Sequence, residues 1–203
     1  MTDGVPFQEF PTSGVVATGV FTFLEWPRPD DVSSMTGLRN SPAVRRWFID
    51  DTVLGEETNR AWILSETNRP WEAILCIRNR SDGRFLGTIG WTDWDPVDRS
   101  VAAGRIAVVA TTAAPVALAT GGRQASAAFD AGASLADRFL RHFDLSSVRT
   151  SYVVGNERAA RLNEALGMRI VGRSVRTRPD GSPIEIVDLR MSRQEWQSRR
   201  EGS

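Results

Sequence analysis

The sequence contains no lysine, because all 25 of its basic residues are arginine. A chain without a lysine amine cannot form a Schiff base, anchor pyridoxal phosphate or supply the lysine of a nucleotide-binding phosphate loop. It has one histidine, His142, and one cysteine, Cys76, which excludes a zinc site built from several such side chains and a disulfide within the chain. A single thiol is typical of a reducing compartment, so we expect a cytoplasmic protein that holds no metal.

An excess of charge of one sign and a long apolar run are also missing. The 25 acidic residues balance the arginines, which leaves no broad basic surface for nucleic acid or an anionic membrane. No stretch approaches 18 apolar residues, and residues 1–10 lack the basic start and apolar segment of a signal peptide. We expect a soluble monomer or homodimer that acts on a small molecule and binds neither nucleic acid nor a membrane.

The hydrophobic residues, 41% of 203, are enough for the core of one domain. We expect an irregular lead-in at residues 1–14, the domain at 15–197 and a tail at 198–203. Apolar periodicity and turn residues predict, in order, a strand (17–26), helices (30–40, from 42, and 56–66), strands (71–78, 85–94 and 101–109), a long helix (123–143), a strand (148–154), a helix (157–166) and a hairpin (170–178 and 184–191). This order predicts a mixed α/β (α+β) single domain whose middle strands form an antiparallel meander.

Four phrases stand out in order along the chain: Leu38-Arg39-Asn40 with Val44–Phe48, Phe85–Gly90, the strand and helix of Val148–Met168, and Val187–Met191 before Glu195-Trp196. Together they resemble the GCN5-related N-acetyltransferase (GNAT) superfamily, in particular its branch of ribosomal-protein and amino-sugar N-acetyltransferases. The resemblance implies a GNAT-like domain whose mostly antiparallel central sheet is splayed between two adjacent strands and flanked by helices. It also implies that acetyl-CoA donates an acetyl group, by direct attack, to a primary amine of a small molecule. An amino sugar or a nucleotide-linked amine is a candidate acceptor.

In this family, main-chain amides of a central strand hold the pantetheine arm, and a glycine-containing turn presents N–H groups to the pyrophosphate. The resemblance assigns cofactor contacts to Ala107, Val108, Val109, Gly121, Gly122, Arg123, Gln124, Ala125, Asn156, Ala160 and Asn163. The turn at 121–125 departs from the glycine spacing of the family, so it is a degenerate pyrophosphate-binding turn. Asn156 is either a helix cap alone or a cap that also bonds the pantetheine. Asn163 stands where many relatives have a tyrosine that protonates the leaving thiolate, and an amide cannot do so.

Residues 106–122 form an uncharged segment rich in Ala, Val and Thr where the family usually has a shorter connection. Three interpretations stay open for this insertion. It is a loop without a catalytic role, a lid over the pantetheine tunnel, or part of a pocket remodelled for another ligand.

The general base in this family is often a carboxylate on the strand that matches residues 102–109, which contain none. The nearest carboxylates, Asp93 and Asp95, follow the preceding strand. They can accept the amine proton, hold a cationic substrate, or only form the turn. Tyr152, the one tyrosine, is the remaining candidate for a catalytic acid, although its alternation with apolar residues in a strand favours core packing.

Six of the seven tryptophans lie in the N-terminal half, which builds the acceptor side of the site in this family. We expect most of them to lie in the core, and an aromatic wall for a sugar ring or a base stays open. The candidate substrate-binding residues are Arg39, Trp47, Trp91 and Trp94.

Two alternatives to acetyl transfer stay open on the same fold. The altered turn, the missing carboxylate and the missing tyrosine are compatible with a domain that has lost acyl transfer and binds a ligand or a partner. The uncharged segment is compatible with a transferase that uses a different acyl donor.

Overall fold

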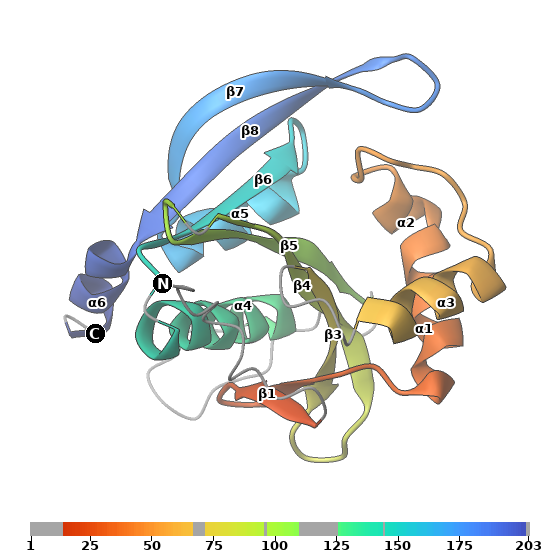
Figure 1. The fold of residues 1–203 in the computed structure, drawn as a ribbon, viewed down its shortest axis with the longest axis horizontal. Coiled ribbons are helices and arrows are strands. Elements are labelled where there is room, and N and C mark those ends of the chain that lie inside the picture. The colour runs from red at the N-terminus through yellow and green to blue at the C-terminus, as the bar shows by residue number, and fades with distance from the viewer. Residues whose placement is uncertain (1–13, 67–71, 96, 110–125, 144, 202–203) are drawn as a thin grey trace.

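The computed structural model of the chain describes residues 14–66, 72–95, 97–109, 126–143 and 145–201. Eight strands form one sheet in the order β1-β2-β3-β4-β5-β6-β8-β7 (Figure 1). The strands are β1 (Val15–Thr18), β2 (Thr22–Glu25), β3 (Ala73–Asn79), β4 (Phe85–Asp95), β5 (Ser100–Val108), β6 (Ser147–Val153), β7 (Arg169–Thr177) and β8 (Pro183–Ser192). The helices are α1 (Val32–Asn40), α2 (Pro42–Arg45), α3 (Glu56–Glu66), α4 (Ala127–Asp137), α5 (Glu157–Leu166) and α6 (Arg193–Glu201).

Neighbouring strands are antiparallel except for β5 and β6, which run parallel. Helices pack against both faces of this sheet, so the prediction of a mixed α/β single domain is confirmed. Among the described residues, no helix is both long and apolar enough to cross a bilayer.

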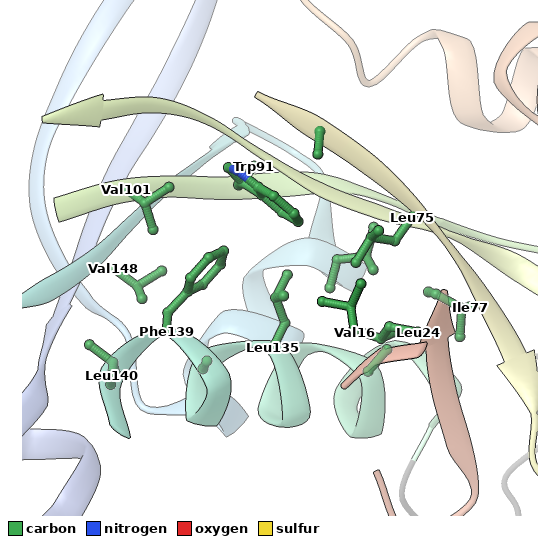
Figure 2. Close-up of a cluster of buried hydrophobic side chains, with 14 of the residues drawn as sticks. Val16, Leu24, Leu75, Ile77, Trp91, Val101, Leu135, Phe139, Leu140 and Val148 are labelled. Atoms are coloured by element: carbon green, nitrogen blue, oxygen red, sulfur yellow. The ribbon is translucent and has the colours of Figure 1, made fainter. Parts of the chain in front are cut away.

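The main core lies between the sheet and α4. Figure 2 shows Leu75, Trp91 and Val101 pointing from the strands toward Leu135 of α4 and Phe139 of the π-helical turn that continues it. The rings of Trp91 and Phe139 meet edge to face with their centres 5.4 Å apart. Full burial of each such side chain stabilises the fold by about 1.5–3 kcal/mol, which makes this layer the principal source of stability.

A smaller core lies on the opposite face of the sheet, under α1 and α3. Val32 and Met35 of α1 and Ile63 of α3 pack there against Cys76 of β3. Because side chains alternate along a strand, Leu75 faces α4 while the next residue, Cys76, faces α1. In Figure 1 the helices α1–α3 lie together at one side of the molecule, and the β7–β8 hairpin arches away from the rest of the sheet.

Several predicted elements are confirmed with their ends. The α3 helix spans Glu56–Glu66 and α5 spans Glu157–Leu166, as the patterns predict. The side chain of Asn156 caps α5, and Gly167 ends it with a φ of 88°. The β3-β4-β5 meander and the terminal β7–β8 hairpin also form as predicted.

The single N-terminal strand predicted at 17–26 is wrong, because the structure has two short strands, β1 and β2. The chain turns between them at Gly19–Phe21, where the carboxylate of Asp130 accepts the main-chain N–H groups of Val20 and Phe21 at 2.8 and 3.1 Å. This turn depends on a residue of α4, so its signal is not local.

Two further corrections concern helices. Within the described residues, the helix predicted at 123–143 begins at Ala127, because Ser126 caps it, and it ends in a π-helical turn at Arg138–His142. No helical pattern follows residue 191 in the sequence, and the structure has α6 there. Since Trp196 is the only large apolar residue of α6, no helical period is visible in the sequence.

Candidate active site

The adjacent strands β5 and β6 separate partway along their length. Residues 100–102 of β5 pair with residues 147–149 of β6. Beyond these positions β5 continues to Val108 and β6 to Val153 without pairing with each other. Because the strands are parallel, the gap opens toward the C-terminal ends of both.

A cleft of about 1830 Å³ occupies this gap. Its lining comes from β4, β5, β6, β7 and β8, from the start of α4, from α5, from Arg199 of α6, and from residues around α2 between 43 and 50. Pockets for drug-sized ligands have volumes of roughly 300–1,000 Å³, so this cleft has room for one long ligand together with a second, smaller one.

A bulge bends β5 beside the gap. Between Gly104 and Ala107, two residues of β5 oppose a single residue of β4. One of them, Arg105, has a φ of 54°, a left-handed conformation that costs a residue other than glycine about 1–3 kcal/mol. Its guanidinium forms an ion pair with Glu72 and lies 4.8 Å from the ring centre of Trp62. These contacts fix the bulge, which gives β5 an irregular edge where it faces the cleft.

The α5 helix supplies a polar wall at the open end of the cleft. Asn156 caps this helix by accepting the N–H of Ala159 at 3.1 Å. Arg158 and Arg161 line the cleft beside the cap. The N-terminus of a helix carries a partial positive charge and unpaired N–H groups, so this wall is suited to a negatively charged group.

Asn163, one turn further along α5, is 7% exposed and lines the same cleft. Its main-chain carbonyl accepts the N–H of Met168 at 2.9 Å. The side-chain amide of Asn163 forms no hydrogen bond to any residue that the structure describes. A buried amide facing a cleft is suited to bond a polar ligand there.

The face of β6 and β8 that points away from α4 forms the other side of the cleft. Asp188 of β8 lies opposite Ser151 of β6, and its Oδ2 accepts the hydroxyl of Ser174 at 2.9 Å. Further along this face, Trp47 packs against Val153 and the neighbouring isoleucines of β8. This face therefore carries a fixed carboxylate next to an aromatic wall.

The predicted catalytic residues lie in three different settings. Asp93 lines the cleft, is exposed, and has a left-handed φ of 53°. The carboxylate of Asp95 accepts the N–H groups of Val97 and Asp98, both at 2.9 Å, which is the bonding of a turn. Tyr152 is half-buried and lines the cleft. The structure brings Asp93 and Tyr152 to the cleft and leaves Asp95 outside its lining.

The predicted substrate-binding residues also divide. Trp47 lines the cleft. Trp91 also lines the cleft, but its indole is 1% exposed and packs in the α4 core, so it forms part of the cleft floor. Trp94 packs against the same core and does not line the cleft.

Arg39 does not line the cleft either. Its guanidinium lies 4.0 Å from the ring centre of Phe48 and donates to the main-chain carbonyl of Asp50. Burial lowers the pKa of Arg39, and the charges of Asp50 and Asp51 partly oppose that change. The contacts of Arg39 with Phe48 and Asp50 hold α1 against the segment that follows α2.

Among the predicted cofactor-binding residues, Ala107, Val108, Asn156 and Asn163 line the cleft. Ala160 is absent from the lining. Val109 donates its N–H to the carbonyl oxygen of Leu86 at 2.9 Å, so its amide is bonded to the β4 side. Gly121, Gly122, Arg123, Gln124 and Ala125 lie outside the described residues, as does most of the uncharged segment at 106–122.

Sequence reasoning missed Asp188 and Arg149, which both line the cleft. Each is a charged residue inside a strand that is otherwise largely apolar or small, and such residues are depleted from strand interiors without a specific reason. That signal was present in the sequence. Their placement at the same cleft depends on the register between β6 and β8.

Comparisons with known proteins agree with this architecture. A family model described as "Acetyltransferase (GNAT) domain" matches residues 22–169. A search of curated proteins found no match. Among solved structures, a GCN5-related N-acetyltransferase from Brucella melitensis is similar with a TM-score of 0.73 and 13% identity, over 95% of this chain and 84% of that one.

Two further structures have the same fold. The spermidine N-acetyltransferase of Vibrio cholerae, solved with CoA and spermine, has a TM-score of 0.72 and 12% identity, over 87% of this chain and 98% of that one. FdhC, a nucleotide-linked sugar GNAT, has a TM-score of 0.69 and 13% identity, over 91% and 94%. At these identities the structural matches show the fold alone. Since the family model matches well over half of the chain, this protein belongs to the GNAT acetyltransferase family.

Proposed function

We propose that this protein transfers an acetyl group from acetyl-CoA to a primary amine of a small molecule, in the cleft between β5 and β6. The observation that carries the proposal is the separation of these strands after residue 102, which leaves one edge of β5 facing a large cleft. The balanced charge of the chain supports a small-molecule acceptor and argues against nucleic acid as a partner.

The free edge of β5 fits a pantetheine arm. Main-chain groups of successive strand residues point toward opposite neighbours. Because the N–H of Val109 bonds to Leu86 of β4, we place the main-chain groups of Val108 on the side of the gap. Such groups can bond the amides of pantetheine and orient a thioester carbonyl without a distinctive side chain.

The start of α5 fits the phosphates of the same ligand. Its helix N-terminus, together with Arg158 and Arg161, provides positive charge at the open end of the cleft. The side chain of Asn163 supplies a further polar contact along the arm. We also propose that residues 121–125 contact the pyrophosphate, as the sequence predicts.

Acetyl-CoA supplies an activated acetyl group on a thiol leaving group. The protein must orient the amine and take up its proton. Asp188 is suited to this role because Ser174 fixes one of its oxygens and the residue is half-buried in the cleft wall. Asp93, which also lines the cleft, is the second candidate. Since Asn163 cannot protonate a thiolate, the leaving group takes its proton from Tyr152 or from solvent, which suffices for a thiol pKa of about 8.5.

Thermal shift with acetyl-CoA tests the donor site. A ligand at about 100 times its Kd stabilises the folded state by about 2.7 kcal/mol, and we expect the melting temperature to rise accordingly. Val108→Pro removes one main-chain N–H on the gap side, where a strand tolerates proline, and Val108→Ala is the matched control that keeps it. We expect the proline variant alone to lose the shift while its melting temperature without ligand stays near that of the alanine variant. No shift of the wild type at millimolar acetyl-CoA contradicts the proposal.

A further inference from the structure

Two arginines lie side by side at the closed end of the cleft. Arg149 of β6 and Arg190 of β8 are direct antiparallel partners, and both line the cleft. Side chains of directly opposed residues share one face, with Cβ atoms about 4.5–5.5 Å apart. Val148 and Met191, their neighbours in the chain, pack in the α4 core, so the two guanidiniums lie on the opposite face.

Buried serines hold both guanidiniums in place. The Nε of Arg149 donates to the hydroxyl of Ser100 at 3.0 Å, and the Nε of Arg190 donates to the hydroxyl of Ser147 at 3.0 Å. Both serines are fully buried and pair with each other where β5 and β6 still run together. The side chains of the two arginines are therefore oriented by the sheet itself.

The positive charge of this pair is only partly compensated. Among the described residues Arg190 forms one ion pair, with Asp98 at 3.3 Å, and the side chains of Arg190 and Asp98 are each more than 40% exposed. Arg149 donates its Nη2 to the main-chain carbonyl of Asp93 at 3.0 Å and forms no ion pair with a described carboxylate. Like charges placed directly opposite each other in a sheet are destabilising. An anionic ligand between the two guanidiniums would relieve that repulsion.

The position of the pair separates it from the phosphates of the donor. Arg149 stands at the last paired position of β6, whereas Arg158 and Arg161 line the cleft at the start of α5, beyond the end of β6. The strand between them rises about 3.3 Å per residue, so the two cationic groups lie at opposite ends of the gap. The carboxylate of Asp188 lies on the same face as the arginine pair, two residues along β8 from Arg190.

We propose that Arg149 and Arg190 bind an anionic group of the acceptor, so that the substrate is a small amine that also carries a phosphate or a carboxylate. The planar guanidinium donates two parallel hydrogen bonds to either oxyanion. Asp188, on the same face, then receives the ammonium end of such a molecule. The inference rests on the proposed function for the reaction at this site, whereas anion binding by the pair can be measured without turnover.

Three amines with the same two-carbon frame test the inference: phosphoethanolamine, β-alanine and the uncharged ethanolamine. With acetyl-CoA as donor, we expect kcat/KM for at least one anionic amine to exceed that for ethanolamine by about 30-fold, which corresponds to one charge-assisted hydrogen-bonded contact. Arg149→Met should abolish this preference and leave the KM for acetyl-CoA unchanged. The matched control is Arg173→Met, because Arg173 is an exposed arginine of β7 outside the cleft. Arg190→Met tests the second partner and replaces the first variant if that one does not fold.

A binding experiment distinguishes failure of the anion site from failure of the proposed acetyl transfer. CoA is first added to saturation, so that its own phosphate contacts are occupied, and phosphoethanolamine and β-alanine are then titrated by calorimetry. Binding that Arg149→Met weakens by about 30-fold supports the anion site even if no amine is acetylated, a result that would overturn only the proposed function. An equal or higher kcat/KM for ethanolamine, or anion binding that Arg149→Met and Arg190→Met both leave intact, overturns the inference.

Discussion

The carboxylate of Asp130 on α4 accepts the main-chain N–H of Thr22 at 2.9 Å and the hydroxyl of Thr22 at 2.8 Å, although the two residues are 108 positions apart in the sequence. The same carboxylate accepts the N–H groups of Val20 and Phe21. One side chain thus closes the turn between β1 and β2 and attaches it to the helix that covers the main core.

Asp130→Ala leaves these main-chain donors without their acceptor in a buried site. Each unsatisfied donor costs about 1–3 kcal/mol, and we expect a loss of about 3 kcal/mol in the free energy of unfolding, measured by urea denaturation. Glu164→Ala, at an exposed position of α5, should change it by less than about 0.5 kcal/mol. Equal stability of the two variants would contradict the anchoring role of Asp130.

Gly19→Ala should weaken the same contact from the other side. A Cβ at Gly19 would lie 2.3 Å from the Oδ2 of Asp130, which its hydrogen bonds prevent from moving away. We expect a destabilisation of about 1–3 kcal/mol, as for other overpacked sites. In combination with Asp130→Ala the clash disappears, so the two changes should be markedly less than additive. Strict additivity would show that Gly19 has another role.

The buried arginine Arg78 should be indispensable for stability. It is 7% exposed, and its guanidinium bonds both Glu25 and Asp31, which are also buried. Burial alone would lower the pKa of Arg78, but its bonds to Asp31 and Glu25 raise it.

Arg78→Met would leave the buried carboxylate of Asp31 without its ion-pair partner and Glu25 with only the exposed Arg28, at a cost of about 3–5 kcal/mol. Adding Glu25→Gln and Asp31→Asn should restore part of the lost stability, because no buried charge then remains unpaired. A thermal melting series reports both effects, and a triple variant less stable than Arg78→Met would refute the argument.

Cys76 should be unreactive in the folded protein. Its side chain is fully buried, and burial raises the pKa of its thiol above the ordinary value. Only the thiolate is nucleophilic, so a disulfide reagent in mildly alkaline buffer should modify the thiol only after urea unfolds the chain. Because Cys76 is the one cysteine, the fully unfolded chain should consume one equivalent of the reagent and release one equivalent of its thiolate leaving group. Rapid modification without denaturant would contradict the structure.

Glu195 should make the attachment of α6 sensitive to acid. Its carboxylate accepts the N–H of Ser192 at 2.8 Å, which holds the pKa of Glu195 below its ordinary value of 4.5. A lowered pKa in the folded state stabilises the protein at pH values above 4.5, and this contribution is lost as the pH falls through the folded value. The stability difference between wild type and Glu195→Gln should therefore shrink on acidification. Ser192→Ala removes the hydroxyl that also bonds this carboxylate but keeps the main-chain N–H, so it should lose only a smaller share of the pH-dependent part. A stability difference between wild type and Glu195→Gln that does not change with pH would refute the prediction.

The two cleft carboxylates should affect turnover differently. If Asp188 accepts the amine proton, Asp188→Asn should lower kcat by about 100-fold with a small change in the KM for acetyl-CoA. Asp93→Asn, at the exposed wall, should lower it less. Asp82→Asn, in the β3–β4 turn, controls for the change of charge. If Asp93→Asn lowers kcat more than Asp188→Asn does, the general base is Asp93 of β4.

Much of the fold follows from local sequence. The apolar period of residues 56–66 and 157–166 predicts α3 and α5, and Asn156 and Gly167 mark the ends of the second, because a cap depends on residues a few positions away. The meander and the terminal hairpin follow for the same reason, since a turn sequence joins strands that are adjacent in the chain.

The absence of lysine and the balanced charge were likewise readable from the sequence and excluded other classes of protein. The order of elements and the phrases at 38–48, 85–90, 148–168 and 187–196 led to the right family by resemblance. The tertiary structure decided which side chains meet. Only the register of β6 with β8 brings Arg149 beside Arg190, and only the packing of α4 brings Asp130 to the β1–β2 turn. It also moved Trp91 into the core and Asp95 into a turn. Contacts between residues far apart in the chain depend on the simultaneous packing of many elements, and no local sequence pattern encodes this packing.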